Sequence, residues 1–595
     1  MATNSNRPEG VDTMTKPDKK TASFIRSLCM GRIEEDLIVP FPVMKKEEGE
    51  SLRTIFDSLN GWLKNKDKDF REWDFKGEMP KSFIDEMKEF GLFSLIVPEE
   101  FGGLGLSATG YSRALQQLTI YDGSVALTAG AHSSIGMKGL VLFGNDEQKK
   151  KYLPKLATGE MIAAFCLTEA GAGSDAAAIR TKAERKNGKW VINGEKIWIT
   201  NGGIADFFTV FATTDTPEGK ITAFIVTKDM KGVRSGMHED KMGIRASSTT
   251  TIYLENVEVP DENVLGEVGK GFKVAMKILN NGRTGLGGGC IGGMKKAIAA
   301  CTKQAKQRKQ FGRAIAEFGL IKQKIGNMVV DCYTAEAVVS MVAGNIDDGY
   351  EDYAVEAAIS KVYATEALWR TVDEALQIAG GNGFMREFMY ERAMRDSRIN
   401  RIFEGTNDIL RLFIALTAMN DVGRQLKDVA SSLGNVFSDP IKGFGVISEY
   451  ASKRITTATG IGHDKFGKIH PALKSYTDTY ERLTGDLASA ADRILRKHGK
   501  GIIEKQFATR RLADIMIDMY VLACTISRVS SAVAEKGEKG TIQERQILDA
   551  FIWQVKRRVA ENLSRIDDND DEAIKALADH AVELEAFAWD NLPKA

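Results

Sequence analysis

The chain changes its hydrophobic pattern twice, and this change limits the folds open to it. Helical periodicity precedes and follows residues 161–265, which are instead rich in β-branched and aromatic side chains at strand length, as in KITAFIVTK and TTTIYLENVEV. Within this block Asn193-Gly194 predicts a hairpin turn. One strand-rich block between two helical regions predicts an α+β fold that is mostly α.

The domain boundaries follow from the same pattern. With 595 residues the chain is too long for one hydrophobic core, so we expect several domains. Residues 1–48 are predicted to form a partly disordered N-terminal arm, and 49–160 an N-terminal helical domain. The central β domain spans 161–265, and a helical bundle follows at 266–424. A helical C-terminal extension occupies 425–595.

Composition argues against several classes of protein. Lys+Arg 81 and Asp+Glu 81 cancel, so nucleic-acid binding is not expected. The six cysteines form no CxxC pair and the six histidines show no metal-binding spacing, so we predict no metal site and a reducing compartment. The first twenty residues lack a secretory apolar core, and no charge-free apolar run approaches the ~20 residues of a membrane helix. We therefore expect a cytoplasmic bacterial protein, with the mitochondrial matrix as the alternative.

Two glycine-rich segments have different interpretations. Gly287, Gly289 and Gly292 fit the GxGxxG pattern of a dinucleotide-binding turn, but the segment before them is helical in pattern. We predict instead that these small residues let two helices approach closely. LTEAGAGSD, at 167–175, follows a short apolar strand and offers hydroxyls and backbone amides to a cofactor or phosphate. An ordinary hydroxyl-rich turn is the alternative there.

A lone carboxylate, Glu404, stands in RIFEGTND at 401–408. One interpretation makes it a loop residue before a helix that Thr406 or Asn407 caps. The other makes it a catalytic carboxylate, and the motifs elsewhere in the chain bear on that choice.

Five motifs taken together resemble those of the acyl-CoA dehydrogenase family. FCLTEAGAGSD, IWITNGG, RKQFG, QIAGGNGF and RIFEGTND occur in the order and spacing of that family, over about residues 50–420. LNNGR, FEGTNDILRL and the helical extension are most similar to its very-long-chain branch. The resemblance implies an N-terminal helical domain, a central β barrel and a C-terminal four-helix bundle, plus the helical C-terminal extension.

The resemblance also implies FAD as cofactor and assigns residues to it. Those expected along the flavin are Phe165, Leu167, Thr168, Ser174, Trp198, Ile199 and Thr200. A second set is expected to contact the pyrophosphate and adenosine of FAD, either in the same subunit or from the neighbouring one. This set is Arg308, Gln310, Gln377, Gly380, Gly381, Thr406 and Asp408. The substrate would contact Ser174, Asn280, Asn281, Arg283 and Gly405.

Dehydrogenation between the α and β carbons of a thioester needs a base for the α proton and a cofactor that accepts hydride. A carboxylate in apolar surroundings suits the first task because desolvation raises its pKa toward working pH. Glu404 follows Ile402 and Phe403, and Gly282 stands where some relatives carry the base. We therefore predict Glu404 as the catalytic base. By resemblance its backbone N–H and a flavin ribityl hydroxyl stabilise the enolate charge.

Two local features modify this expectation. Ala170 replaces the proline usual in the family after Thr-Glu, which predicts a less rigid turn. Ala126 and Gly130 are four residues apart and share a helix face, where they either leave room for a long acyl tail or let helices pack closely.

The resemblance implies dehydrogenation of long-chain acyl-CoA to trans-2-enoyl-CoA in fatty-acid β-oxidation, with electrons passed to an electron-transfer flavoprotein. It also implies a homodimer whose extension covers the surface used for tetramer contacts in shorter members. The segment that contains Lys442, Phe444, Ile447, Lys453, Arg454 and Ile455 is expected to form either an amphipathic membrane-surface segment or a solvated face. Two other functions stay open, an acyl-CoA oxidase and a scaffold that acts through its extension.

Overall fold

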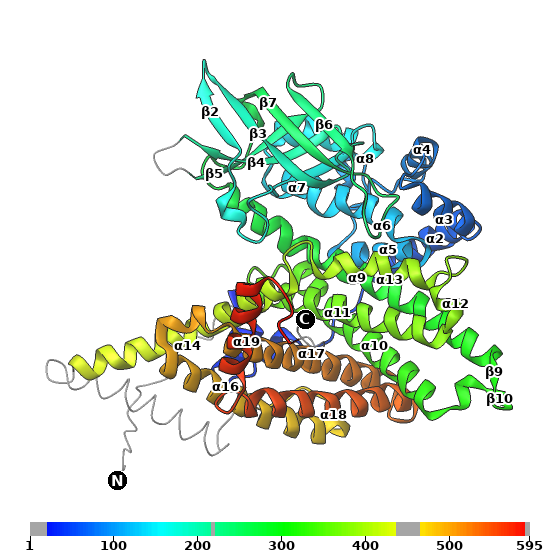
Figure 1. Ribbon diagram of the computed structural model, residues 1–595, viewed down its shortest axis with the longest axis vertical. Helices are drawn as coiled ribbons and strands as arrows, with labels where there is room; N and C mark the ends of the chain where they lie inside the picture. Colours follow the sequence, from blue (N-terminus) through cyan, green and yellow to red (C-terminus); the bar gives the residue numbers. More distant parts are fainter. Residues whose placement is uncertain (1–20, 216–219, 436–464, 590–595) are drawn as a thin grey trace, which may run out of the picture.

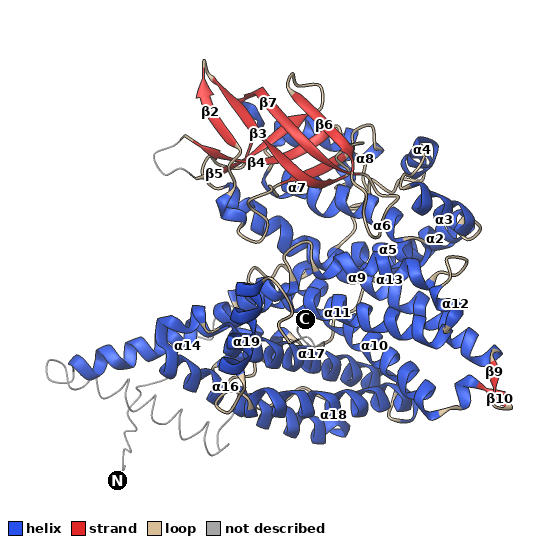
Figure 2. Ribbon diagram, in the orientation of Figure 1, coloured by secondary structure: helices blue, strands red, loops and turns tan. Residues whose placement is uncertain are grey.

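The computed structural model describes residues 21–215, 220–435 and 465–589. Eight strands form one sheet at one end of the molecule, β9 and β10 pair separately far from it, and helices make up most of the rest (Figures 1 and 2). The amphipathic segment predicted between Lys442 and Ile455 lies outside the described residues.

Helices from the first part of the chain pack against the sheet and the central bundle. They are α1 (Phe24–Cys29), α2 (Lys46–Leu63), α3 (Asp67–Lys76), α4 (Lys81–Glu89), α5 (Ala108–Tyr121), α6 (Gly123–Gly130), α7 (Lys138–Phe143) and α8 (Asp146–Thr158). Asp122 begins α6 by accepting hydrogen bonds from two backbone N–H groups of its first turn. A π-helix, Ala131–Gly136, follows α6, and such short π segments are frequent at functional sites.

The sheet has eight strands in the order β6-β7-β3-β2-β4-β5-β8, with β1 paired to β4. They are β1 (Ala163–Cys166), β2 (Lys182–Lys186), β3 (Lys189–Thr200), β4 (Phe207–Thr214), β5 (Ile221–Thr227), β6 (Val233–His238), β7 (Thr249–Pro260) and β8 (Val264–Leu265). Every residue of β5 is buried, as its continuous apolar run requires.

The hairpin turn predicted at Asn193-Gly194 is wrong. These residues lie inside β3, at an irregularity in its pairing with β7. The chain reverses instead at Asn187-Gly188, whose φ angles of 52° and 77° suit a hairpin turn. Gly194 is needed where it is because a Cβ atom there would lie 2.4 Å from Oγ1 of Thr181.

The bundle consists of four long helices, α9 (Gly271–Gln307), α10 (Gly319–Asp347), α11 (Ala354–Ala379) and α14 (Asn407–Asn435). Short elements connect them: β9 (Lys309–Gln310), β10 (Arg313–Ala314), α12 (Gly381–Phe384) and α13 (Tyr390–Arg398). The GxGxxG glycines lie within α9, where a Cβ at Gly287 would be 2.6 Å from Val339 Cγ2 of α10. A Cβ at Gly292 would be 2.1 Å from the Gln116 carbonyl oxygen of α5, which confirms the close helix packing.

Among the described residues, α10 is the one helix long and apolar enough to cross a membrane. Its most apolar window is 61% buried inside the molecule, which fits a helix of a protein core.

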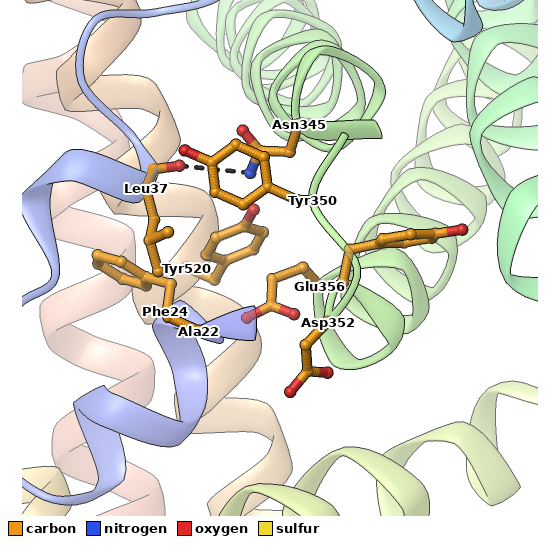
Figure 3. Close-up of a pocket in the computed structure, with 9 residues that line it drawn as sticks. Ala22, Phe24, Leu37, Asn345, Tyr350, Asp352, Glu356 and Tyr520 are labelled. Atoms are coloured by element: carbon orange, nitrogen blue, oxygen red, sulfur yellow. Dashed lines mark hydrogen bonds between the residues drawn. The ribbon is translucent and has the colours of Figure 1, made fainter. Parts of the chain in front are cut away.

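The extension packs α17 against α10 and α14 of the bundle. Its helices are α16 (Lys474–His498), α17 (Gln506–Lys536), α18 (Ile542–Ser564) and α19 (Asp571–Leu584). A cavity of about 10 Å³ remains where the arm, the bundle and the extension meet (Figure 3). There the buried carboxylate of Glu356 accepts hydrogen bonds from the Ser23 hydroxyl and the Ile25 N–H. The three parts therefore share one hydrophobic core.

Candidate active site

Glu404 lies in the turn immediately before α14. The Thr406 hydroxyl accepts a hydrogen bond of 3.2 Å from the Ile409 N–H, so Thr406 caps that helix, as one interpretation of the sequence predicted. Glu404 itself has a φ of 54° and Gly405 one of 92°. Positive φ is uncommon for residues other than glycine, and it is often found at functional sites. Helix capping and a special role for Glu404 are therefore compatible.

One oxygen of the Glu404 carboxylate is enclosed by the protein. Its Oε2 atom is buried, and no described residue gives it a hydrogen bond. The carboxylate lies opposite Gly282 of α9, beside which Ile135 of the π-helix also packs. Burial raises the pKa of Glu404, although the cations of Lys361 and Arg283 act in the opposite direction. The group is thus poised to accept a proton.

Lys361 lies beside Glu404 and was not predicted from the sequence. It is fully buried in α11, and its ammonium donates hydrogen bonds of 2.8 Å to the Gly405 carbonyl and 2.9 Å to Asn407 Oδ1. Burial lowers the pKa of Lys361 to about 7, and the Glu404 carboxylate opposes that shift. A signal was present, because Lys361 interrupts the otherwise small and apolar run AAISKVYA.

Hydrogen bonds connect the loop at 167–175 to Lys196 and Ile197 of β3. The Ile197 N–H donates a 2.9 Å hydrogen bond to the Thr168 carbonyl, and the Lys196 ammonium donates one of 3.1 Å to the Leu167 carbonyl. Lys196 also forms a buried ion pair of 2.6 Å with Glu169. Strand alternation places Lys196 on the same buried face as Ile192, and this was the sequence signal for it.

The loop at 167–175 and strand β3 carry an exposed aromatic side chain, Trp198. Trp198 is 63% exposed and has a φ of 57°, whereas the neighbouring Ile199 is buried. In the described part of the chain, no hydrogen bond engages the hydroxyls of Thr168 and Ser174. An exposed indole face beside free hydroxyl donors fits a planar ring that carries polar edges. Phe165 differs, because its ring packs against Phe211 at 5.0 Å between centroids.

A third group of expected residues lies elsewhere. Arg308 ends α9 and Gln310 belongs to β9, and Figure 1 shows this end of α9 projecting away from the sheet. Gly380 ends α11 with a φ of 61°, a backbone conformation that favours glycine. These residues, with Gln377, Gly381 and Asp408, are exposed. One copy of the chain therefore does not bring Arg308 and Gln310 to Trp198.

The expected substrate residues are partly engaged by the protein. Arg283 is buried beside Glu404 and donates a 2.6 Å hydrogen bond to Asn280 Oδ1. Asn281 donates one of 2.7 Å to the Tyr353 hydroxyl. A cavity of about 30 Å³ lies next to Asn281 and Tyr111.

Gly130 faces two side chains of α5. A Cβ there would lie 3.5 Å from Leu115 and 3.9 Å from the Tyr111 hydroxyl, which are ordinary van der Waals distances, so both interpretations of this helix face stay predictions.

The domain order and these motifs agree with comparisons over almost the whole chain. Residues 49–160, 164–257 and 269–419 match the N-terminal, middle and C-terminal domains of acyl-CoA dehydrogenases. Residues 471–587 match the ACAD9/ACADV C-terminal domain. The chain belongs to the acyl-CoA dehydrogenase family.

Several known acyl-CoA dehydrogenases align with most of this chain. The human mitochondrial very long-chain specific acyl-CoA dehydrogenase is 42% identical over 94% of this chain and 87% of its own. An acyl-CoA dehydrogenase from Bacillus anthracis, solved in complex with FAD, has a TM-score of 0.78 at 32% identity over 95% of this chain and 96% of its own. A chain from the electron transferring flavoprotein structure of Acidaminococcus fermentans has a TM-score of 0.61 at 36% identity, over 64% of this chain and 99% of its own.

Family membership makes the chain an oxidoreductase with FAD as its cofactor. The exposed Trp198 face and the free hydroxyls of the loop fit the flavin part of FAD. Within the described ranges, no cluster of three or more His, Cys, Asp or Glu side chains is placed to hold a metal ion.

Proposed function

We propose that this chain dehydrogenates long-chain acyl-CoA thioesters to trans-2-enoyl-CoA, with Glu404 as the catalytic base. The observation that carries the proposal is the buried Oε2 of Glu404, which has no hydrogen-bond partner in the described structure and faces Gly282. An unpartnered buried carboxylate oxygen costs free energy unless a ligand engages it. Its position suits removal of a proton from a substrate carbon.

The protein's part in the reaction is a proton transfer. Glu404 takes the proton from the α carbon, and the β hydrogen leaves with its electron pair, so that a double bond forms between the two carbons. FAD, when bound, supplies the acceptor for that hydride. The Glu404 backbone N–H has no partner among the described hydrogen bonds, so it is available to the thioester oxygen as charge develops there.

In this proposal two copies of the chain together bind each FAD molecule. Leu167, Thr168, Ser174, Trp198 and Thr200 would hold the flavin. Its pyrophosphate and adenosine would contact Arg308, Gln310, Gln377, Gly380 and Gly381 of a second copy, because these residues lie away from Trp198 within one chain.

The surface near Arg308 supports such a dimer. Phe311 and Leu320 are 94% and 74% exposed there, and large exposed apolar side chains are frequent at protein contacts.

The physiological setting is inferred from the relatives. A very long-chain relative and the matching extension favour long-chain substrates and fatty-acid β-oxidation. The likeness to the Acidaminococcus chain favours an electron-transfer flavoprotein as acceptor. We assign the chain to the bacterial cytoplasm, with the mitochondrial matrix as the alternative, and propose peripheral membrane contact through the segment at 442–455.

The test is anaerobic mixing with palmitoyl-CoA and, separately, octanoyl-CoA, followed by flavin absorbance. We expect palmitoyl-CoA to bleach the flavin rapidly and octanoyl-CoA to do so slowly. Glu404→Gln should slow bleaching by about a thousandfold, within the range of general-base catalysis, while the flavin stays bound.

Other outcomes separate the alternatives. Rapid reoxidation of the reduced flavin by oxygen with peroxide release would indicate an oxidase. A bound flavin that no acyl-CoA reduces would favour the scaffold.

A further inference from the structure

The extension reaches the catalytic turn through a chain of charged hydrogen bonds. Helices α14 and α17 lie side by side in the lower half of the molecule (Figure 1). Arg411, in the second turn of α14, donates a 2.6 Å hydrogen bond from Nε to Oδ1 of Asp514 in α17. Asp514 belongs to the extension, whereas Arg411 follows Glu404 closely in sequence. One ion pair therefore connects the extension to the element that carries the base.

The guanidinium of Arg411 is held on two sides. Its Nη1 and Nη2 atoms donate hydrogen bonds of 2.8 and 3.0 Å to the two oxygens of Glu366 in α11. Such a bidentate pair fixes the plane of the guanidinium group. Asp514 binds the remaining edge, so the two carboxylates together determine where Arg411 lies.

The next residue in this series of hydrogen bonds is Asn407, which is buried at the first position of α14. Its Nδ2 atom donates hydrogen bonds to Thr365 at 3.0 Å and to Glu366 at 3.2 Å. Its Oδ1 accepts one of 2.9 Å from Lys361, whose ammonium also donates to the Gly405 carbonyl at 2.8 Å. The connection from Asp514 to the turn is thus continuous.

The turn needs this support because its backbone is strained. Glu404 at a φ of 54° adopts a conformation that costs roughly 1–3 kcal/mol for a residue other than glycine. Such a conformation persists only where surrounding contacts hold it. The hydrogen bond from Lys361 to the Gly405 carbonyl is the contact that does so directly.

We propose that Asp514 of the extension positions the turn that carries Glu404, acting through Arg411. The inference rests on the proposed role of Glu404 as base. It gives the extension a part in the reaction in addition to its packing on the bundle. Asp514 is a positioning residue, since it touches neither the carboxylate nor the pocket.

The experiment measures flavin reduction by palmitoyl-CoA in Asp514→Asn, as a function of substrate concentration. We expect the limiting rate to fall about tenfold, because small misplacement of a catalytic group has large kinetic effects. The half-saturating concentration should change less than about twofold, since Asp514 is remote from substrate. Asp514→Glu, which keeps the charge, should restore the limiting rate to within about twofold.

Asp518→Asn is the matched control. Asp518 lies one turn further along α17 and receives hydrogen bonds of 2.7 to 3.1 Å from Arg558 of α18, so its ion pair stays inside the extension. This variant should lower thermal stability and leave the limiting rate unchanged. In Arg411→Gln the further change Asp514→Asn should add no loss, because both act through one contact.

Three results would overturn the proposal. They are an unchanged limiting rate in Asp514→Asn, an equal loss in a folded Asp518→Asn, and no recovery in Asp514→Glu. If Asp518→Asn does not fold, the limiting rates of Asp514→Asn and Asp514→Glu still test the proposal. A wild-type flavin that acyl-CoA fails to reduce would instead refute the proposed function, and the positioning role with it.

Discussion

A Cβ atom built on Gly282 would lie 3.5 Å from Oε2 and 3.7 Å from Oε1 of Glu404. Gly282 lies on α9 and Glu404 lies in the turn before α14. Side chains at these two positions therefore reach the same place from different parts of the chain. A side chain at 282 that carries a carboxylate would enter the space now occupied by the Glu404 carboxylate.

This relationship predicts that the base can be moved. In the double variant Gly282→Glu, Glu404→Gly, we expect flavin reduction by palmitoyl-CoA at least about tenfold faster than in Glu404→Gly alone. Recovery will be partial, because the new Cβ lies 3.2 Å from Ile135 and must displace it. The matched control is Gly282→Gln, Glu404→Gly, which adds similar bulk without a base. Equal rates in the two double variants would refute the prediction.

Lys361 is predicted to set the pH at which the base works. Glu404 must be deprotonated to act, so the rate falls as pH falls through its pKa. The Lys361 cation lowers that pKa, hence Lys361→Met should raise it and move the acid limb of kcat/KM to higher pH. Stopped-flow flavin reduction between pH 5 and about 9 measures this, in a range that covers typical catalytic pKa values.

Lys361→Arg serves as the control for charge at this position. It should leave the acid limb near that of the wild type even if the maximal rate falls. An acid limb that moves to lower pH in Lys361→Met would contradict the sign of the effect.

Ala170→Pro should stabilise the loop at 167–175. No described backbone hydrogen bond uses the Ala170 N–H, and its φ is not positive, so proline fits. We expect the free energy of unfolding to rise by about 0.4–1 kcal/mol, chiefly because proline restricts the unfolded chain. Chemical denaturation of the holoenzyme measures it. The gain should stay small, because the Lys196–Glu169 ion pair already holds this loop, and a destabilised variant would show that proline does not fit.

The turn that carries Glu404 shows what sequence can and cannot specify. The apolar neighbours Ile402 and Phe403 predicted a dry position for Glu404, but Ile402 is 46% exposed, and the carboxylate lies instead against Gly282 of a distant helix. The partners of the turn come from distant helices: Lys361 from α11, and Asp514 from α17 through Arg411. Lys361 stands out within its apolar run, but no local pattern indicates which distant turn it contacts.

The central sheet gives the complementary example. The strand-rich block contains three Asn-Gly pairs, and two of them, Asn187-Gly188 and Asn193-Gly194, lie only six residues apart. Both satisfy the local rule for a hairpin, but only Asn187-Gly188 turns, whereas Gly194 pairs with β7 and lies too close to Thr181 for a side chain. Strand existence was predictable here, whereas register depended on tertiary packing.

Trp198→Gly is predicted to separate stability from cofactor binding. The indole is 63% exposed, so its removal loses little burial, and glycine relieves the positive φ of 57°. The free energy of unfolding of the flavin-free protein should change by less than about 1 kcal/mol. FAD should dissociate more readily, because the flavin loses its aromatic support. Equilibrium titration of FAD into the flavin-free protein tests this, and an unchanged dissociation constant would contradict it.

Glu336 joins three parts of the molecule and should dominate its acid stability. The carboxylate, in α10, accepts hydrogen bonds of 2.7 Å from Arg113 of α5, 2.6 Å from Lys295 of α9 and 2.8 Å from Arg528 of α17. These cations lower the pKa of Glu336 from 4.5 to about 2 despite its burial. Because the folded-state pKa is depressed, the stabilisation is complete above pH 4.5 and disappears as pH falls toward 2.

Glu336→Gln should therefore lower the free energy of unfolding near neutral pH by about 3 kcal/mol, and the deficit should vanish near the folded-state pKa of the carboxylate. Urea unfolding of both proteins at a series of pH values gives the difference directly. Asp331→Asn is the matched control in the same helix, since Asp331 pairs with the single cation of Arg370. A deficit for Glu336→Gln that stays constant across the acid range would show that packing, and not the charge on Glu336, holds the extension to the bundle.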